Sequence, residues 1–260
     1  MGRAKEILVK VIPSKIANDF VKKHHYSGKI VNNSSLHFGC FLDEKLHGVM
    51  SYGNSIDKSK VKLTVKNTGW NEFIELNRMA FDEYLPKYSE SRCIAISIKL
   101  LKKNAPHIKW IVSFADGSQC GDGTIYRASG FKLIGCKINK QILNWNGKII
   151  AKKSLDGKNY PSINGKYFSR HLIETNQAKA IEGYQLKYIY LIDKSCKITV
   201  PILPFSKIDE MGAGMYKGKK ITLQERRVTK SDAVDSNATS DLGNQCATIT
   251  PTSQNKNNKK

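Results

Sequence analysis

The chain has 260 residues, enough for one large domain or two small ones with a buried core. Its 43 basic residues outnumber 22 acidic ones, and the net charge of +21 indicates a polyanionic partner such as nucleic acid. No apolar run is long enough to cross a membrane, no secretory signal is evident, and the composition excludes collagen, coiled coil and full disorder. Only 7 of the basic residues are arginines, so a lysine-biased proteome is the alternative explanation of the charge.

Hydrophobic periodicity predicts strands and helices that alternate along most of the chain. In chain order, the expected elements are a strand within 7–12, a helix from 14 to a loop at 24–28, strands at 36–42, 46–52 and 73–81, a helix from 89 or 91 to about 105, a strand at 108–115, a short helix at 124–129, and strands at 131–136 and 185–192. This order favours an α/β fold with a mixed central sheet and helices on both faces. It resembles the element order of GNAT acyltransferases.

Two stretches differ from the rest in composition. Residues 137–166 hold seven lysines and one acidic residue, a pattern that we interpret as too polar to form core. Residues 229–260 are rich in Ser, Thr, Asn, Gln and Asp, which predicts a disordered tail. We therefore expect one GNAT-like domain over 1–228, with a lysine-rich insertion at about 137–180.

Arg78 is the first candidate for chemistry, because it lies between apolar neighbours in the strand expected at 73–81. Strict alternation would place Leu76, Arg78 and Ala80 on one face, and Glu75 with Asn77 on the other. An arginine in apolar surroundings needs an anion, so Arg78 is expected either to bind a ligand or to form a structural salt bridge.

Asp116 ends the apolar run 108–115 and begins a loop with three glycines. Ligands bind at the carboxyl ends of central strands in open α/β sheets, so Asp116 is a candidate general base or binder of an exocyclic amine. The alternative is an aspartate that caps a turn. Tyr126 follows ten residues later and could face the same crevice, or pack as an ordinary core residue.

A metal site is not expected. The six cysteines include no CxxC motif and no paired Cys/His spacing, and the adjacent His24 and His25 should point in different directions. We interpret Cys120 as a passive thiol.

Several motifs, in order and with matched spacing, resemble the phage Mom family over residues 7 to about 225. They are His25-Tyr26-Ser27-Gly28, Glu75-Leu76-Asn77-Arg78-Met79-Ala80, Glu90-Ser91-Arg92, Ala115-Asp116-Gly117 and the segment from Gly123 to Phe131. The resemblance implies a GNAT-like enzyme that converts adenine in double-stranded phage DNA to N6-carbamoylmethyladenine in the host cytoplasm, protecting the DNA from restriction. It implies catalytic roles for Asp116, Arg78 and Tyr126, and donor binding by Ser91, Ser89 and Tyr26.

The acyl donor stays open between acyl-CoA and glycyl-tRNA. The segment 85–91 lacks the glycine-rich turn that binds CoA pyrophosphate in GNAT enzymes, and it carries Glu90. Direct acylation of N6 would give an amide, whereas a glycyl group could rearrange to the carbamoylmethyl product. Other functions that fit the pattern are an acyl-CoA-dependent N-acetyltransferase acting on a protein or small molecule, and a non-enzymatic DNA-binding protein.

Double-stranded DNA is the expected partner, with aminoacyl-tRNA as a second one and a dimer as one candidate oligomeric state. We expect Lys148, Lys152, Lys153 and Trp145, in the lysine-rich stretch, to hold the DNA backbone with loose sequence preference. The alternative for this stretch is a solvated hairpin.

Overall fold

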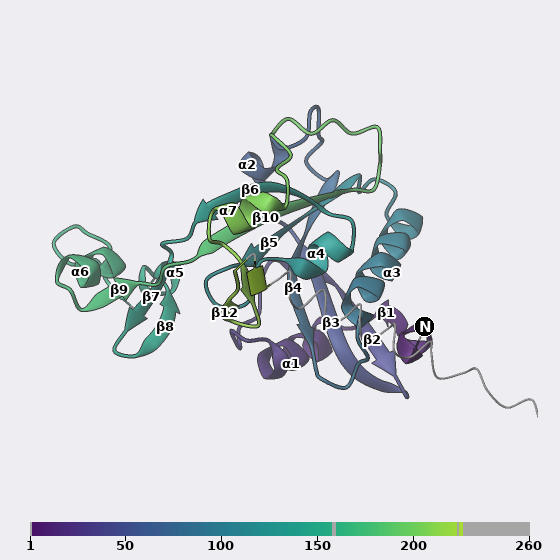
Figure 1. The fold of residues 1–260 in the computed structure, drawn as a ribbon, viewed down its shortest axis with the longest axis horizontal. Helices are drawn as coiled ribbons and strands as arrows, with labels where there is room; N and C mark the ends of the chain where they lie inside the picture. The colour runs from purple at the N-terminus through teal and green to yellow at the C-terminus, as the bar shows by residue number, and fades with distance from the viewer. Residues whose placement is uncertain (1, 158–159, 223, 226–260) are drawn as a thin grey trace, which may run out of the picture. The chain divides into compact units, whose positions relative to one another are not determined.

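A computed structural model describes residues 2–157, 160–222 and 224–225. The chain divides into two units, residues 1–220 and 221–260. The first unit contains, in order, the 3-10 helix Arg3–Glu6, β1 (Leu8–Val11), α1 (Ser14–His24), β2 (Ser34–Leu42), β3 (Lys45–Gly53), α2 (Lys58–Lys62), β4 (Phe73–Phe81), α3 (Ser89–Asn104), β5 (Trp110–Asp116), α4 (Thr124–Ala128), β6 (Lys132–Ile138), β7 (Ile142–Trp145), β8 (Lys148–Ala151), α5 (Lys152–Leu155), α6 (Phe168–Glu174), β9 (Ala178–Ala180), β10 (Tyr184–Leu191), α7 (Ser206–Glu210), β11 (Met215–Tyr216) and β12 (Lys219–Lys220) (Figure 1). The tail expected at 229–260 lies outside the described residues.

Seven strands form the central sheet, in the order β1-β2-β3-β4-β5-β10-β6. β4 and β5 pair in parallel, and the other neighbouring strands pair antiparallel. The late strand β10 lies between β5 and β6, so the sheet is mixed and not a simple meander. The predicted α/β class, with a mixed central sheet and helices on both faces, is confirmed.

Helices cover both faces of this sheet. On one face α3 and α4 pack through Ile94 and Tyr126 into the largest apolar cluster, which includes Ile111 and Tyr188. On the opposite face, Ala17 and Val21 of α1 pack on Val49 and Ala80, while α2 covers the neighbouring strands. The site described below lies where the neighbouring strands β4 and β5 of this sheet stop pairing.

β4 contains an irregularity that the sequence pattern did not predict. Ser51 of β3 pairs with Arg78, but the next residue pairs with Leu76, so Asn77 is an extra residue in the strand. Such a bulge reverses the alternation of faces. Leu76 packs in the largest apolar cluster, on the face covered by α3 and α4, whereas Ala80 packs against α1 on the opposite face. The prediction that the two residues share a face is therefore wrong.

The lysine-rich insertion between β6 and β10 has a sheet and a core of its own. Its strands pair in the order β8-β7-β9. Leu143, Leu155, Leu172 and Ala178 are buried together. The interpretation that residues 137–166 are too polar to form core is wrong, since apolar residues far apart in sequence meet here. Among the described residues, no helix is both long and apolar enough to cross a membrane.

Candidate functional site

The site begins where β4 and β5 diverge. Their parallel pairing runs from Phe73 with Trp110 to Leu76 with Ser113, and does not continue beyond it. The Ser113 hydroxyl donates to the Leu76 carbonyl oxygen at 2.8 Å and closes the paired end. Both strands run on beyond their last paired residues, β4 to Phe81 and β5 to Asp116, and end at the same edge of the sheet. Open α/β sheets bind ligands at such an edge.

Asp116 lies at this edge and contacts Tyr26 from the loop after α1. The Tyr26 hydroxyl donates to Asp116 Oδ2 at 3.0 Å, and Gln119 donates to the same oxygen at 3.3 Å. Oδ1 accepts from the Ser118 backbone at 2.9 Å, so the expected turn-capping bond is also present. Burial of the hydroxyl, together with the Asp116 charge, raises the pKa of Tyr26, which therefore stays a hydrogen-bond donor at neutral pH.

Arg78, in β4, contacts His25, the residue before Tyr26. Its Nη1 donates to His25 Nε2 at 3.3 Å, and His25 Nδ1 lies 2.9 Å from the Ser27 hydroxyl. Burial and the Arg78 charge lower the pKa of His25 to about 3, so the ring is neutral. A guanidinium only donates, so its contact requires Nε2 as the acceptor, whereas the Ser27 backbone N–H, 3.1 Å from Nδ1, requires Nδ1 as the acceptor; a neutral ring has one acceptor nitrogen and satisfies one of these two donors at a time.

No ion pair in the described chain holds Arg78, so the structural salt bridge considered from the sequence is not what keeps it in place. Its Nε is buried without a hydrogen-bond partner. Burial lowers the pKa of Arg78, while the nearby Tyr26, Tyr126 and Glu75 act in the opposite direction. A guanidinium remains charged under these conditions, so Arg78 offers a positive charge and a free donor to a ligand.

Tyr126 lies on the face of the sheet that α3 and α4 cover. Its ring packs against Phe131 and Tyr188, with ring centroids 5.5 and 5.3 Å away. The Ser113 hydroxyl bonds to its hydroxyl, and burial raises the pKa of Tyr126 to about 12. Tyr126 thus packs as a core residue, which is one of the two roles expected from the sequence. Its hydroxyl also interacts electrostatically with Arg78.

Two further groups belong to this cluster and were missed or discounted in the sequence. Glu75 interacts electrostatically with Arg78 and Tyr126, and burial raises its pKa. It was missed because strict alternation placed it on the face opposite Arg78; the bulge puts both on one face. Burial and the Asp116 charge raise the pKa of Cys120, which agrees with a passive thiol.

The serines expected to bind the donor lie at the start of α3. Ser89 is fully buried and its hydroxyl donates to the Pro86 carbonyl at 2.5 Å. Ser91 is partly buried and its hydroxyl donates to the Tyr88 carbonyl at 3.2 Å. No contact joins either serine to the Asp116 and Arg78 group in the described structure. Of the two, only Ser91 has surface to offer a donor.

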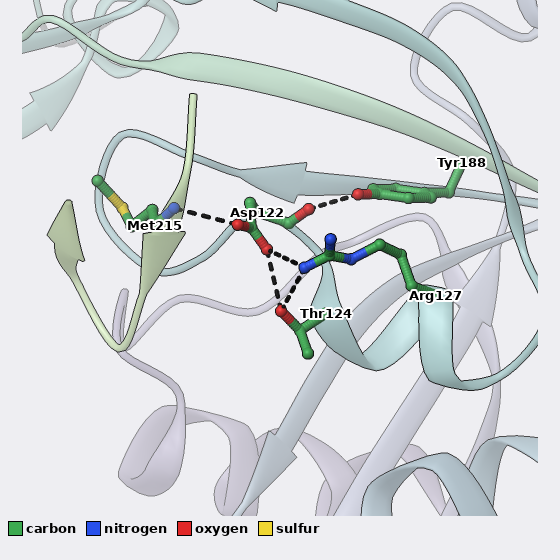
Figure 2. A network of polar contacts seen from close by, with 5 residues as sticks. All are labelled: Asp122, Thr124, Arg127, Tyr188 and Met215. Carbon is green, nitrogen blue, oxygen red and sulfur yellow. Dashed lines mark hydrogen bonds and ion pairs between the residues drawn. The ribbon is translucent and has the colours of Figure 1, made fainter. Parts of the chain in front are cut away.

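The loop after Asp116 is held by a buried carboxylate. Asp122 accepts hydrogen bonds from Thr124 Oγ1 at 3.0 Å, Arg127 Nη2 at 3.2 Å and the Met215 backbone at 3.2 Å (Figure 2). The Tyr188 hydroxyl donates to its backbone carbonyl. This network fixes the start of α4, and with it Tyr126, relative to the sheet.

Asp122→Ala is expected to destabilise the fold by about 3–5 kcal/mol, because it leaves the largely buried Arg127 without its carboxylate. Urea denaturation measures the loss as a lower midpoint. The control is Asp19→Ala, which removes an exposed ion pair with Lys15 and should leave the midpoint nearly unchanged. Equal midpoints for the two variants would show that the network does not stabilise the loop.

No group of three or more His, Cys, Asp or Glu side chains suited to a metal ion occurs among the described residues. The proposed DNA-binding side chains lie in the insertion. Lys148 and Lys153 are exposed, and Lys152 is partly buried at the start of α5. Trp145 packs edge-on against Tyr160 and Phe168, at 5.9 and 5.7 Å, so it belongs to the small core of the insertion.

Comparison with known proteins gives a family match over most of the chain. The sequence profile of the Mom protein family matches residues 6–207. A protein named methylcarbamoylase mom, from Escherichia phage Mu, is 37% identical over 133 residues, which are 51% of this chain and 55% of that protein. The aligned part of this chain thus spans about half the length of that relative.

Solved acetyltransferases also align with the structure. One from Bacillus subtilis, in complex with CoA, covers 71% of this chain and 98% of its own, with a TM-score of 0.42 and 12% identity. A GNAT family acetyltransferase from Elizabethkingia anophelis, with acetyl-CoA bound, covers 71% and 97%, with a TM-score of 0.40 and 14% identity. The fold itself is defined by the strand order and packing described above.

Proposed function

The chain belongs to the Mom protein family, and on that premise we propose that it is a transferase that modifies adenine in phage DNA to N6-carbamoylmethyladenine. The observation that carries the proposal is the group formed by Asp116, Tyr26 and Arg78 where β4 and β5 cease to pair. A carboxylate and an unpaired guanidinium at one strand edge suit the transfer of a group from an activated carbonyl donor to an amine.

The adenine amine is inaccessible inside a duplex, so the base must be turned out of the stack to react. In the proposed complex Asp116 accepts the hydrogen of the exocyclic N6 and removes its proton, while Tyr26 orients the carboxylate. Arg78 donates to the carbonyl oxygen of the donor, where negative charge develops. Tyr126, with its pKa near 12, supplies a neutral hydroxyl beside Arg78.

The donor that fits the product is an activated glycyl ester, such as glycyl-tRNA. N6 attacks the ester carbonyl, the N6–C bond forms, the ester C–O bond breaks, and the alcohol leaves with a proton. The glycyl amine then attacks C6, the C6–N6 bond breaks, and the released nitrogen becomes a carboxamide. Atoms balance, and the product carries NH–CH2–CO–NH2 on C6. The absence of a glycine-rich turn before α3 supports this donor over acyl-CoA.

Co-expression with a plasmid in a bacterial host tests the proposal. Nucleoside mass spectrometry should show deoxyadenosine with one added glycinamide minus ammonia, and labelled glycine should enter the modified base. An adenine that carries one added acetyl group would instead indicate an enzyme that uses acetyl-CoA as its donor. Plasmid DNA without any modified nucleoside, from cells that hold the folded protein, would contradict the proposed activity.

The insertion is proposed to hold the DNA backbone. Changing Lys148, Lys152 and Lys153 together to Gln should weaken binding to all duplex sequences alike. The plot of the logarithm of the binding constant against the logarithm of salt concentration should become less steep, by about two to three units of slope. Fluorescence anisotropy at several salt concentrations measures both quantities. A matched triple change of Lys15, Lys60 and Lys207, each in an exposed ion pair elsewhere, removes the same charge. If both triples weaken binding equally, the effect is one of net charge and not of the insertion.

A further inference from the structure

Two consecutive residues of β4, Asn77 and Arg78, carry buried polar atoms that lack hydrogen-bond partners. Among the described residues, five buried side-chain nitrogen or oxygen atoms have no hydrogen-bond partner: His47 Nε2, Ser55 Oγ, Asn77 Nδ2, Arg78 Nε and Arg92 Nε. Asn77 and Arg78 are consecutive in β4, and Ser55 lies beside the Glu75 carboxyl. A buried polar group without a partner costs about 1–3 kcal/mol, so the orphaned donors of Asn77 and Arg78 indicate that a ligand supplies their partners.

Glu75 is the acid in this group, and no ion pair in the described structure engages it. Two cations influence it electrostatically, Arg78 and Lys187. Arg78 instead bonds to His25, and the Lys187 amine donates to the Thr64 hydroxyl at 2.7 Å. The carboxyl is therefore partly buried, within electrostatic range of Arg78, and available to a ligand that brings its own donor.

The groups around Glu75 favour a hydrogen-bonding cation. The Ser55 residue is only 5% exposed, so its hydroxyl faces the interior beside the carboxyl. A carboxylate and a hydroxyl together match the donors of a primary ammonium or amine. Arg78 and Asn77 then offer N–H donors to carbonyl oxygens of the same ligand. An aminoacyl group carries both features, an amine and a carbonyl separated by one carbon.

The proposed reaction involves two amines, adenine N6 and the glycyl amine. Asp116 is assigned to adenine N6 and leaves the glycyl amine without a carboxylate. We propose that Glu75, assisted by Ser55, binds the free amine of the aminoacyl donor and takes the proton that this amine loses when it attacks C6. This inference rests on the proposed function and names the donor class that the site selects. It assigns the two carboxylates of the site to the two amines of the reaction.

The proton transfer balances within the rearrangement. The amine forms the C6–N bond and gives a proton to the Glu75 carboxylate. The C6–N6 bond breaks, its electron pair stays on the former N6, and that nitrogen takes the proton back as it becomes the carboxamide. A carboxyl that both accepts and returns a proton works best with a raised pKa, and burial raises the pKa of Glu75. An acetyl donor has no amine and would leave Glu75 unused.

A binding experiment tests donor recognition directly. The probes are 3′-glycylamido-adenosine, a stable mimic of the aminoacyl end, and the same compound with its amine acetylated. Calorimetry with the wild-type protein should show at least about tenfold tighter binding of the free-amine probe, a difference of about 1.4 kcal/mol. Glu75→Gln should remove this preference. Glu210→Gln, an exposed carboxylate on α7, should keep it.

Analysis of DNA modified by Glu75→Gln tests the proton transfer. The unrearranged N6-glycyl base has the same mass as the product but keeps a primary amine, which an amine-specific reagent labels. The variant should modify less DNA, and part of its product should be labelled. Rearranged product at the wild-type level would overturn the proton role.

Each remaining outcome also decides the matter. If the variant modifies no DNA, the probes decide: a retained preference for the free amine overturns the proposal, and a lost preference supports it. If the wild-type protein modifies adenine but does not distinguish the probes, this inference fails while the proposed function stands. If the wild-type protein modifies no adenine, the proposed function itself fails.

Discussion

Asp116→Asn is expected to lower adenine modification by at least about 100-fold, while affinity for duplex DNA stays unchanged. Asparagine keeps the shape of the side chain and can still accept from the Ser118 backbone. It cannot take a proton from N6, and general-base catalysis of this kind contributes about 10²–10⁴ in rate. Mass spectrometry of plasmid nucleosides gives the modified fraction, and anisotropy gives DNA affinity.

Two controls separate chemistry from structure in this experiment. Asp19→Asn changes an exposed aspartate of α1 and should leave modification at the wild-type level. Tyr26→Phe removes the hydroxyl that donates to Asp116 Oδ2, and should lower the rate less than Asp116→Asn does. An Asp116→Asn protein with full activity would show that another group accepts the N6 proton.

The strands could be predicted closely because each carries its own local pattern. The expected strand 73–81 has the same bounds as β4, and the hairpin around Asp43 and Glu44 forms as expected, with both turn residues at positive φ. Asp116 could be placed at a strand end for the same reason. Its neighbour Tyr26 is 90 residues away in sequence, and only the family resemblance indicated that it belongs to the site.

Features that depend on pairing between strands could not be predicted. The bulge at Asn77 arises from the register of β3 against β4, and nothing in the residues 73–81 signals it. It is this extra residue that brings Glu75 and Arg78 to one face. The same limit applies to the insertion: Leu143 and Leu172 each lie in a short apolar segment far apart in sequence, so their shared core appears only when the chain folds.

Arg78→Lys is expected to lower modification by about 10²–10³, the usual cost of losing one donor that stabilises a developing oxyanion. Lysine keeps the positive charge but not the planar fork, so it cannot bond to His25 and to a donor oxygen in the same geometry. The loss should appear in the rate of modification and not in DNA affinity, because Arg78 is partly buried and offers little to the phosphate backbone.

The control for this substitution is Arg3→Lys, which alters an exposed arginine bonded to Glu6 and Asp43 and should leave modification unchanged. His25→Gln adds a graded test, since the amide oxygen can still accept from Arg78 but the rigid ring is gone. It should fall between wild type and Arg78→Lys. If Arg78→Lys modifies DNA at the wild-type rate, charge alone suffices at this position, and the orientation of the guanidinium by His25 has no part in catalysis.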